Sequence, residues 1–211
     1  DLEKNERHTA TVFSEAAKSN NVERIIYLGG LQNDPKLSPH LRSRAEVGNI
    51  FLGSGVPTIS FGAAVIIGSG SLSFEMLRYL TEILPAMITP RWVRTKIQPI
   101  AIRDVLRYLV EARNLPEGIN RTFDIGGPDI MTYQKMMQGY ARVAGLRKRL
   151  ILPINILSPG LSARWIGLVT PVPKKIARPL VDSLKTEVIC AEHDIKQYIP
   201  DPPEGLLGFS D

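Results

Sequence analysis

The chain has 211 residues, 44% of them hydrophobic, and carries 26 Lys and Arg against 21 Asp and Glu, a formal net charge of +5. This length and composition suit one well-buried core, with or without a smaller lobe, and they argue against a disordered chain. The charges are interspersed along the sequence, so the basic excess permits an anionic ligand without predicting nucleic-acid binding.

The first predicted elements are a helix, a strand and a second helix. Residues 2–19 show apolar positions at helical spacing, and Asn20-Asn21 favours a left-handed end to that helix. The segment 22–30, VERIIYLGG, is a β-branched run that ends in two glycines and is predicted to be a buried strand. Ser38 suits the N-cap of a helix that continues to about residue 52.

Strands and helices then alternate up to residue 145. The predicted strands are 56–68, 100–102 and 121–127. The predicted helices are one with Ser73 as N-cap, one over 103–113, and one that Thr132 caps and Gly145 closes. The segment 85–99 is predicted to be irregular.

This alternation predicts a mainly parallel α/β sheet. Ligands of such sheets bind beyond the carboxyl ends of the strands. Those ends carry Gly29-Gly30, Gly68-Ser69-Gly70 and Gly126-Gly127, and we expect the three to share one rim. The alternative is that each glycine only makes a tight turn.

The glycines at 68–70 invite comparison with a dinucleotide-binding turn, because they follow an apolar strand and precede a helix. The pattern is G-x-G-x-x-S, with Ser73 where a third glycine would allow close helix packing. The acidic residue expected at 88–91 is absent, since Ile, Thr, Pro and Arg stand there. This turn is therefore not predicted to be the primary pyrophosphate site.

Cysteine and histidine usage excludes other classes of site. Cys190 is the only cysteine, so no internal disulfide is expected, and a reducing, cytoplasmic setting fits. The three histidines are scattered, and no metal site is expected. The apolar stretch 150–173 contains Arg164 and four prolines, so no membrane-spanning helix is expected there, although an apolar lobe or a peripheral membrane contact fits.

The strands RIIYLGG and TISFGAAVIIGSGS, followed by QPIAIRDVLRYLVEA and RTFDIGGPDIMTYQKMM, resemble the later part of an extended short-chain dehydrogenase/reductase. More narrowly, the chain resembles the atypical, NmrA-like NAD(P)-binding branch often labelled nucleoside-diphosphate-sugar epimerase. The resemblance implies the later portion of a Rossmann-like, doubly wound parallel sheet over 1–148, with 70–98 on the substrate side. It implies a smaller, mostly helical, Pro-rich substrate-side lobe over 149–211.

The resemblance also implies NAD or NADP as cofactor, with the pyrophosphate turn upstream of Asp1, so we expect the chain to be a fragment. The family's Tyr-x-x-x-Lys pair is replaced here by His40 and Arg44, and the preceding strand ends without a hydroxyl. By this resemblance His40 is a candidate general acid and Arg44 a candidate contact to the cofactor ribose. The alternative is a half-exposed histidine at a helix start and a surface or ion-paired arginine.

The resemblance assigns the remaining candidate residues. The family's Arg-x-x-Asn-Val-x-Gly segment keeps only its last glycine here, which leaves an apolar wall and favours an apolar or aromatic substrate over a diphosphate sugar. The candidate cofactor-binding residues are Gly29, Gly30, Arg44, Ala63, Ala64 and Val65. The candidate substrate-side residues are Gly68, Ser69, Gly70, Ser71, Trp92, Gln98 and Arg103.

Structural roles remain open for several of these residues. Trp92 also suits a packed anchor, and Gln98 and Arg103 also suit the first turn of a helix.

Three functions follow as hypotheses. The first is an NAD(P)-dependent oxidoreductase or epimerase-like protein that acts on a small, apolar molecule. The second is a non-catalytic, NmrA-like cofactor-sensing or assembly module, favoured by the loss of Tyr, Lys and the strand-end hydroxyl. The third is a scaffold whose stretch 150–173 docks on a partner or membrane surface. A homo-oligomer is compatible with each.

Overall fold

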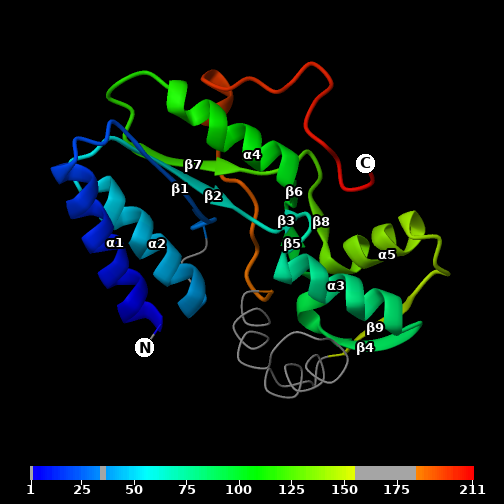
Figure 1. Ribbon diagram of the computed structural model, residues 1–211. Coiled ribbons are helices and arrows are strands. Elements are labelled where there is room, and N and C mark those ends of the chain that lie inside the picture. The colour runs from blue at the N-terminus through cyan, green and yellow to red at the C-terminus, as the bar shows by residue number, and fades with distance from the viewer. Residues whose placement is uncertain (1, 34–36, 155–183) are drawn as a thin grey trace.

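The computed structural model describes residues 2–33, 37–154 and 184–211. Its centre is a parallel three-stranded sheet in the order β1-β2-β7 (Figure 1). The strands are β1 (Ile25–Gly30), β2 (Thr58–Ala63) and β7 (Arg121–Ile125). Gly30 pairs with Ala63, and Ala63 pairs with Ile125, so the carboxyl ends of all three strands meet at one edge.

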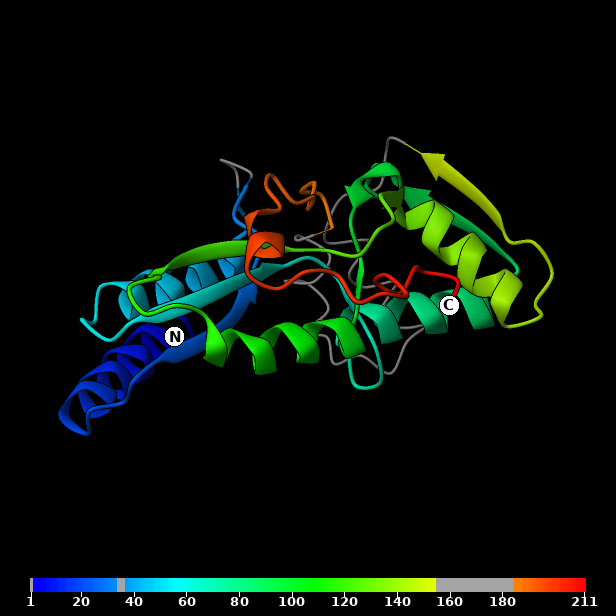
Figure 2. The same ribbon diagram turned by 90° about the horizontal axis from the view of Figure 1, so that it is seen from above.

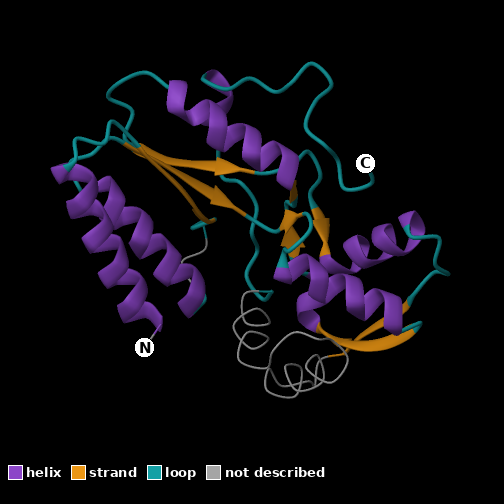
Figure 3. Ribbon diagram, in the orientation of Figure 1, coloured by secondary structure: helices purple, strands orange, loops and turns teal. Residues whose placement is uncertain are grey.

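Helices cover both faces of this sheet (Figure 3). On one side, α2 (Pro39–Leu52) packs on β1 and β2, and α1 (Leu2–Ser19) packs on α2. On the other side lies α4 (Ile102–Glu111), whose buried Tyr108 ring stands 6.0 Å from the ring of Phe61. The predicted doubly wound, parallel α/β arrangement is confirmed.

The close approach of α2 to the sheet depends on two glycines. A Cβ atom at Gly48 would stand 3.2 Å from the Ser60 hydroxyl oxygen, and one at Gly30 would stand 2.7 Å from a methyl carbon of Leu41. Small residues at these places let the helix backbone lie directly on β1 and β2. This contact fixes the start of α2 beside the carboxyl end of β1.

A second group of elements lies at the other end of the molecule (Figure 2). Here α3 (Leu72–Ile83) and α5 (Tyr133–Val143) pack together, and the parallel pair β4 (Ala86–Pro90) and β9 (Leu150–Ile154) lies beside them. Their common core includes Met76, Leu80, Trp92 and Met136. The remaining short elements are β3 (Ile66–Ile67), η1 (Arg91–Arg94), β5 (Lys96–Ile97), β6 (Ile100–Ala101), η2 (Ala112–Asn114), β8 (Met131–Thr132) and η3 (Asp194–Gln197).

Three predicted helix ends are confirmed by their geometry. The Ser38 hydroxyl accepts from the backbone N–H of Leu41 at 3.3 Å, and the Thr132 hydroxyl accepts from that of Lys135 at 3.2 Å. Asn21 adopts the left-handed conformation with φ of 52°. The prediction of Ser73 as N-cap was wrong, because α3 begins two residues earlier and Ser71 caps it.

Two strand predictions also need correction. The segment 56–68 is not one strand, because β2 ends at Ala63 and the chain then crosses to pair β3 with β6. An apolar run does not reveal such a change of partner, since both halves are compatible with a buried strand. The segment 85–99 is not irregular, because it contains β4 and β5.

The C-terminal residues return to the main sheet. Ile195 and Ile199 are buried in the core that β2, β7 and α4 share, and Val188 forms an isolated parallel bridge with Ile97. The boundary between 1–148 and 149–211 stays a prediction. Most of the apolar stretch 150–173 falls within 155–183, which lies outside the described residues. In the part of the chain that is described, no helix is long and apolar enough to cross a membrane.

Candidate functional site

A pocket of about 370 Å³ opens at the carboxyl ends of β1 and β2. Its lining includes the ends of β1 and β2, the first turns of α2 and the start of α3. Eight residues predicted from the sequence line it: Gly29, Gly30, His40, Arg44, Ala63, Ala64, Val65 and Ser71. The α/β topology therefore brings the candidate cofactor residues and the candidate acid to one place, although their roles stay predictions.

The other candidate residues lie outside the lining of this pocket. In the turn at 68–70, Gly70 has φ of +83°, and a Cβ at Gly68 would lie 2.6 Å from a methyl carbon of Ile102. The Ser71 backbone N–H closes this turn by donating to the Gly68 carbonyl at 3.2 Å. Packing and backbone conformation thus account for both glycines without a ligand, and Ser69 lies in the turn between them.

Trp92 lies behind the pocket wall, because its buried ring packs edge-on against Tyr133 with 5.8 Å between centroids. Gln98 is buried and bridges two segments: its side chain donates to the Gly127 carbonyl at 2.8 Å and accepts from the Cys190 N–H at 3.0 Å. Arg103 pairs with Asp104 at 2.8 Å. These contacts give Trp92, Gln98 and Arg103 structural roles outside the pocket lining.

Seven lining residues were not among the predicted site residues: Leu28, Leu41, Ile66, Ser73, Tyr133, Leu184 and Val188. Tyr133, Leu184 and Val188 come from later parts of the chain. Tyr133 directly follows Thr132, and the capping signal of Thr132 predicts where the helix starts. That signal does not predict the direction in which the phenol of Tyr133 points. Burial strongly raises the pKa of Tyr133, so the phenol stays protonated at neutral pH.

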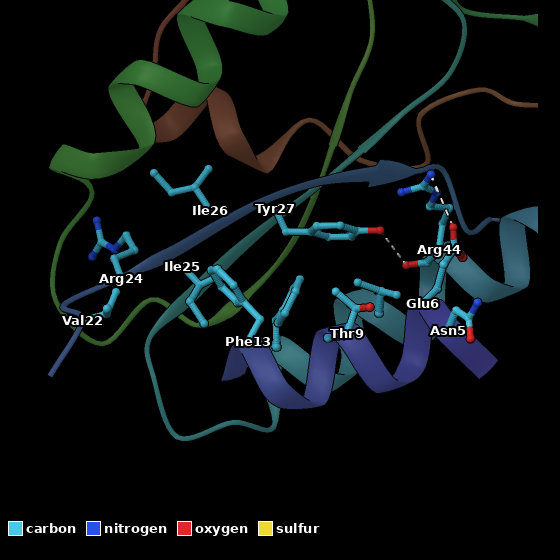
Figure 4. A pocket seen from close by; sticks show the side chains of 13 residues that line it. Asn5, Glu6, Thr9, Phe13, Val22, Arg24, Ile25, Ile26, Tyr27 and Arg44 are labelled. Atoms are coloured by element: carbon cyan, nitrogen blue, oxygen red, sulfur yellow. Dashed lines mark hydrogen bonds and ion pairs between the residues drawn. The ribbon is translucent and has the colours of Figure 1, made fainter. Parts of the chain in front are cut away.

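Charge is concentrated at the His40 and Arg44 side of the pocket. Arg44 lies 3.5 Å from the Glu6 carboxylate of α1, and its carbonyl oxygen accepts from the Tyr27 hydroxyl at 3.2 Å (Figure 4). Burial lowers the pKa of His40, the positive charge of Arg44 lowers it further, and Glu6 opposes both. His40 is therefore neutral at pH 7, with one ring nitrogen as donor and the other as acceptor.

A polar network fixes Asn33, which follows β1, at the rim of the pocket. The Asn33 amide donates to one Asp124 carboxylate oxygen at 2.7 Å and to the Ile189 carbonyl at 3.0 Å. The same Asp124 oxygen accepts from the Ala191 N–H at 2.8 Å. The carboxyl end of β7 thus joins Asn33, after β1, to the C-terminal segment that supplies Val188.

No protein-family model matches the sequence, and no curated protein matches it significantly. Solved structures do match by shape. A nucleoside-diphosphate-sugar epimerase from Staphylococcus aureus aligns with a TM-score of 0.67 at 15% identity, over 94% of this chain and 67% of its own. A triphenylmethane reductase from Citrobacter sp. gives 0.71 at 16% identity, over 95% and 67%.

An NADPH-dependent quinone oxidoreductase from Escherichia coli, solved with NADPH, aligns with a TM-score of 0.70 at 18% identity, over 95% of this chain and 68% of its own. At these identities the likeness shows the fold. It agrees with the parallel sheet and the helices on both faces, and confirms the predicted Rossmann-like α/β class. The chain spans about two thirds of the length of each of these three proteins.

Proposed function

We propose that the pocket binds the nicotinamide end of NAD or NADP together with a small apolar molecule, as part of an oxidoreductase or epimerase-like protein. The observation that carries the proposal is the meeting of His40, Arg44 and the apolar wall Ala63–Val65 at the carboxyl ends of two adjacent parallel strands. Ligands of open α/β sheets bind at such strand ends. The named reductases and epimerase with this fold support the same assignment.

The residues present fit the nicotinamide half of the cofactor. Gly29 and Gly30 line the pocket at the end of β1, and the partly exposed Arg44 guanidinium can donate to ribose hydroxyls. The pocket volume of about 370 Å³ accommodates a ring and ribose with a small co-substrate, but not a whole dinucleotide. We therefore propose that a Gly-rich turn upstream of Asp1 holds the pyrophosphate.

His40 is proposed to supply the proton in this reaction. A bound nicotinamide cofactor supplies or accepts hydride, and the imidazole donates or accepts a proton at the substrate oxygen. Because the pKa of His40 is lowered, little imidazolium exists at pH 7, and a step that needs it as acid speeds up as the pH falls. Neutral imidazole can still donate one hydrogen bond and orient the substrate.

The apolar wall favours a substrate without a diphosphate group. Ala63 and Val65 are buried, and Leu184 and Val188 add further apolar side chains to the pocket lining. An aromatic quinone or an aldehyde can desolvate against these side chains, whereas a diphosphate would need cations that this wall does not offer.

The binding part of the proposal is tested by NMR titration of the 211-residue chain with reduced nicotinamide mononucleotide and with NADPH. Both should shift the amide signals of Gly29, Gly30 and Ala64 with similar, millimolar affinity, because the pocket contacts only the half they share. Arg44→Ala should weaken both at least tenfold, and Arg42→Ala, on the same helix but outside the pocket, should not. Micromolar binding of NADPH by calorimetry would show a pyrophosphate site within these residues.

The chemical part is tested by NADPH oxidation with quinones, aldehydes and sugar nucleotides, using a protein that includes the residues upstream of Asp1. His40→Ala should lower kcat by about 100-fold or more, the usual contribution of a general acid. Retained turnover in His40→Ala would remove His40 from the mechanism.

The alternative is a cofactor-sensing or assembly module without turnover. It is favoured by the strand end at Gly29-Gly30, which carries no hydroxyl beside the candidate acid. Tight NADPH binding by that longer protein, with no oxidation by any of these substrate classes, would support the sensor over the enzyme.

A further inference from the structure

Tyr133, the first residue of α5, lines the candidate pocket with an almost completely buried side chain. Only 2% of the residue is exposed. Its ring packs edge-on against Trp92, with 5.8 Å between the centroids, and belongs to the same apolar core as Met136. Because side chains in such a core are closely packed, the orientation of the phenol is fixed.

The Tyr133 hydroxyl group has no hydrogen-bond partner in the described part of the chain. Two other tyrosines differ in this respect: the Tyr27 hydroxyl donates to the Arg44 carbonyl at 3.2 Å, and the Tyr140 hydroxyl donates to the Glu82 carboxylate. Buried polar groups normally have a partner, because an unpaired one loses the hydrogen bonds that water would supply. A buried phenol of this kind therefore suits a partner from outside the protein.

The open space beside this hydroxyl group is the candidate pocket. The described residues contain fully enclosed polar side-chain atoms without a partner, and these lie on Arg24, Thr89, Trp92 and Arg107. The Tyr133 oxygen is not one of them, so it keeps contact with open space although the residue is buried. The pocket is the open space that Tyr133 borders.

The phenol is a neutral donor among apolar neighbours. Leu184 and Val188 line the same pocket from the C-terminal segment, and Ala64 and Val65 line it after β2. Burial alone raises the pKa of Tyr133, so the hydroxyl group keeps its proton at neutral pH. A molecule that fills this part of the pocket should therefore offer one acceptor to the phenol and apolar surface to the rest.

We propose that Tyr133 donates a hydrogen bond to a carbonyl oxygen of the apolar molecule that shares the pocket with the nicotinamide ring. The inference deepens the proposed function and rests on it for the assignment of the pocket to a substrate. Aryl ketones, aldehydes and quinones combine a neutral acceptor with apolar surface, whereas a carboxylate would lose its hydration among these side chains. A hydrocarbon of the same shape would leave the buried phenol unpaired, so Tyr133 selects for carbonyl compounds.

The test compares acetophenone with ethylbenzene, which has a similar shape but no oxygen. The affinity of each for the 211-residue chain is measured by NMR titration, from the methyl signals of Leu184 and Val188. The parent should bind acetophenone about tenfold more tightly, because only this compound pairs the buried donor. Tyr133→Phe removes the hydroxyl group alone and should abolish this preference.

Tyr108→Phe is the matched control. Tyr108 is also 2% exposed, but its ring packs beside Phe61 in the core under α4 and lies outside the pocket lining. Removal of its hydroxyl group should leave the preference for acetophenone unchanged. The proposal would be overturned by equal binding of both compounds to the parent, by an undiminished preference in Tyr133→Phe, or by an equal loss in Tyr108→Phe.

Reduced nicotinamide mononucleotide separates this inference from the proposed function. It should bind the parent and Tyr133→Phe equally, since its proposed contacts are Gly29, Gly30 and Arg44. If it binds while the preference for acetophenone does not depend on Tyr133, the carbonyl contact is wrong and the nicotinamide assignment stands. If the preference depends on Tyr133 while the mononucleotide does not bind, the carbonyl contact stands and the nicotinamide assignment is wrong.

Discussion

Cys190 illustrates how the surroundings of a side chain determine its pKa and reactivity. A Cβ atom at Gly126 would lie 2.7 Å from the Cys190 sulfur, so the thiol packs directly over the glycine that follows β7. Burial, together with the carboxylates of Asp124 and Glu192, raises the pKa of Cys190 to about 12. The thiolate is the reactive form, so this cysteine is protected although it is not fully enclosed.

We expect Cys190 to react slowly with the disulfide reagent DTNB at pH 8. The native protein should label at least about 100-fold more slowly than the chain unfolded in guanidinium, because so little thiolate is present. The unfolded sample serves as the control. Equal rates before and after unfolding would show that the thiol is neither buried nor electrostatically suppressed.

His40 predicts a pH dependence of stability. Its folded pKa lies below its ordinary value, so the unfolded chain binds the proton more tightly, and its contribution to stability is complete above about pH 6.5. That contribution falls as the pH drops below 6.5 toward the folded pKa. In His40→Gln the loss of thermal stability between pH 7.5 and pH 5 should be smaller than in the parent. An identical loss in both proteins would mean that the imidazole is freely solvated.

At the scale of single elements, helix ends depend on particular hydroxyl groups. Ser71 accepts from the Phe74 N–H at 3.4 Å and caps α3, whereas Ser73 lies inside the first turn of that helix. Both serines line the candidate pocket. The cap therefore also fixes the position of one side of the site.

We expect Ser71→Ala to destabilise the protein by about 1 kcal/mol, the usual value of an N-cap hydroxyl. Ser73→Ala, two residues along, should change the free energy of unfolding by less than about 0.5 kcal/mol. Urea denaturation of both variants measures the difference. A larger loss of unfolding free energy in Ser73→Ala than in Ser71→Ala would indicate that Ser73 is the N-cap, as first predicted from the sequence.

The elements that were predicted correctly carry local signals. Ser38, Thr132 and Asn21 mark helix ends through contacts with residues three or four positions away, and such contacts can be read from a short stretch of sequence. The pair β4 and β9 was missed because its partners lie far apart in the chain. Pairing over that distance leaves no pattern in either segment alone.

The residues of the candidate site also divide into those with a local sequence signal and those without one. His40 and Arg44 could be named as candidates because their spacing within one helix is local and resembles a family pattern, and both line the pocket. Leu184 and Val188 reach the pocket only through the path of the C-terminal segment, which no spacing reveals. The break after Ala63 was hidden because alanine, valine and isoleucine suit a straight strand and a change of partner equally well.

At the scale of the whole molecule, Asp124 connects parts of the chain that lie far apart. Its carboxylate accepts from Asn33 after β1 and from the backbone of Ala191, while its own N–H donates to Glu192 at 2.8 Å. Asp124 is buried, so these bonds replace the water that the charge would otherwise hold. The carboxylate therefore joins the rim of the pocket to the C-terminal segment.

Asp124→Asn should lower the free energy of unfolding by about 1–3 kcal/mol, because two charge-assisted bonds are weakened in a buried place. It should also speed the DTNB reaction of Cys190, since one of the carboxylates that raise its pKa is removed. The Asn33→Ala variant removes only one donor and should cost less. Unchanged stability and unchanged labelling in Asp124→Asn would show that the network contributes little.

The burial of Ile195 and Ile199 beneath the central sheet has a consequence for biosynthesis. These side chains complete the core that β2, β7 and α4 share, and the N–H of Leu207 then donates to the buried Asp104 at 2.8 Å. During translation, α4 and the sheet leave the ribosome before these residues exist. The nascent chain must therefore expose the apolar surface under α4 until these residues have been synthesised, which makes this surface a natural substrate for chaperones.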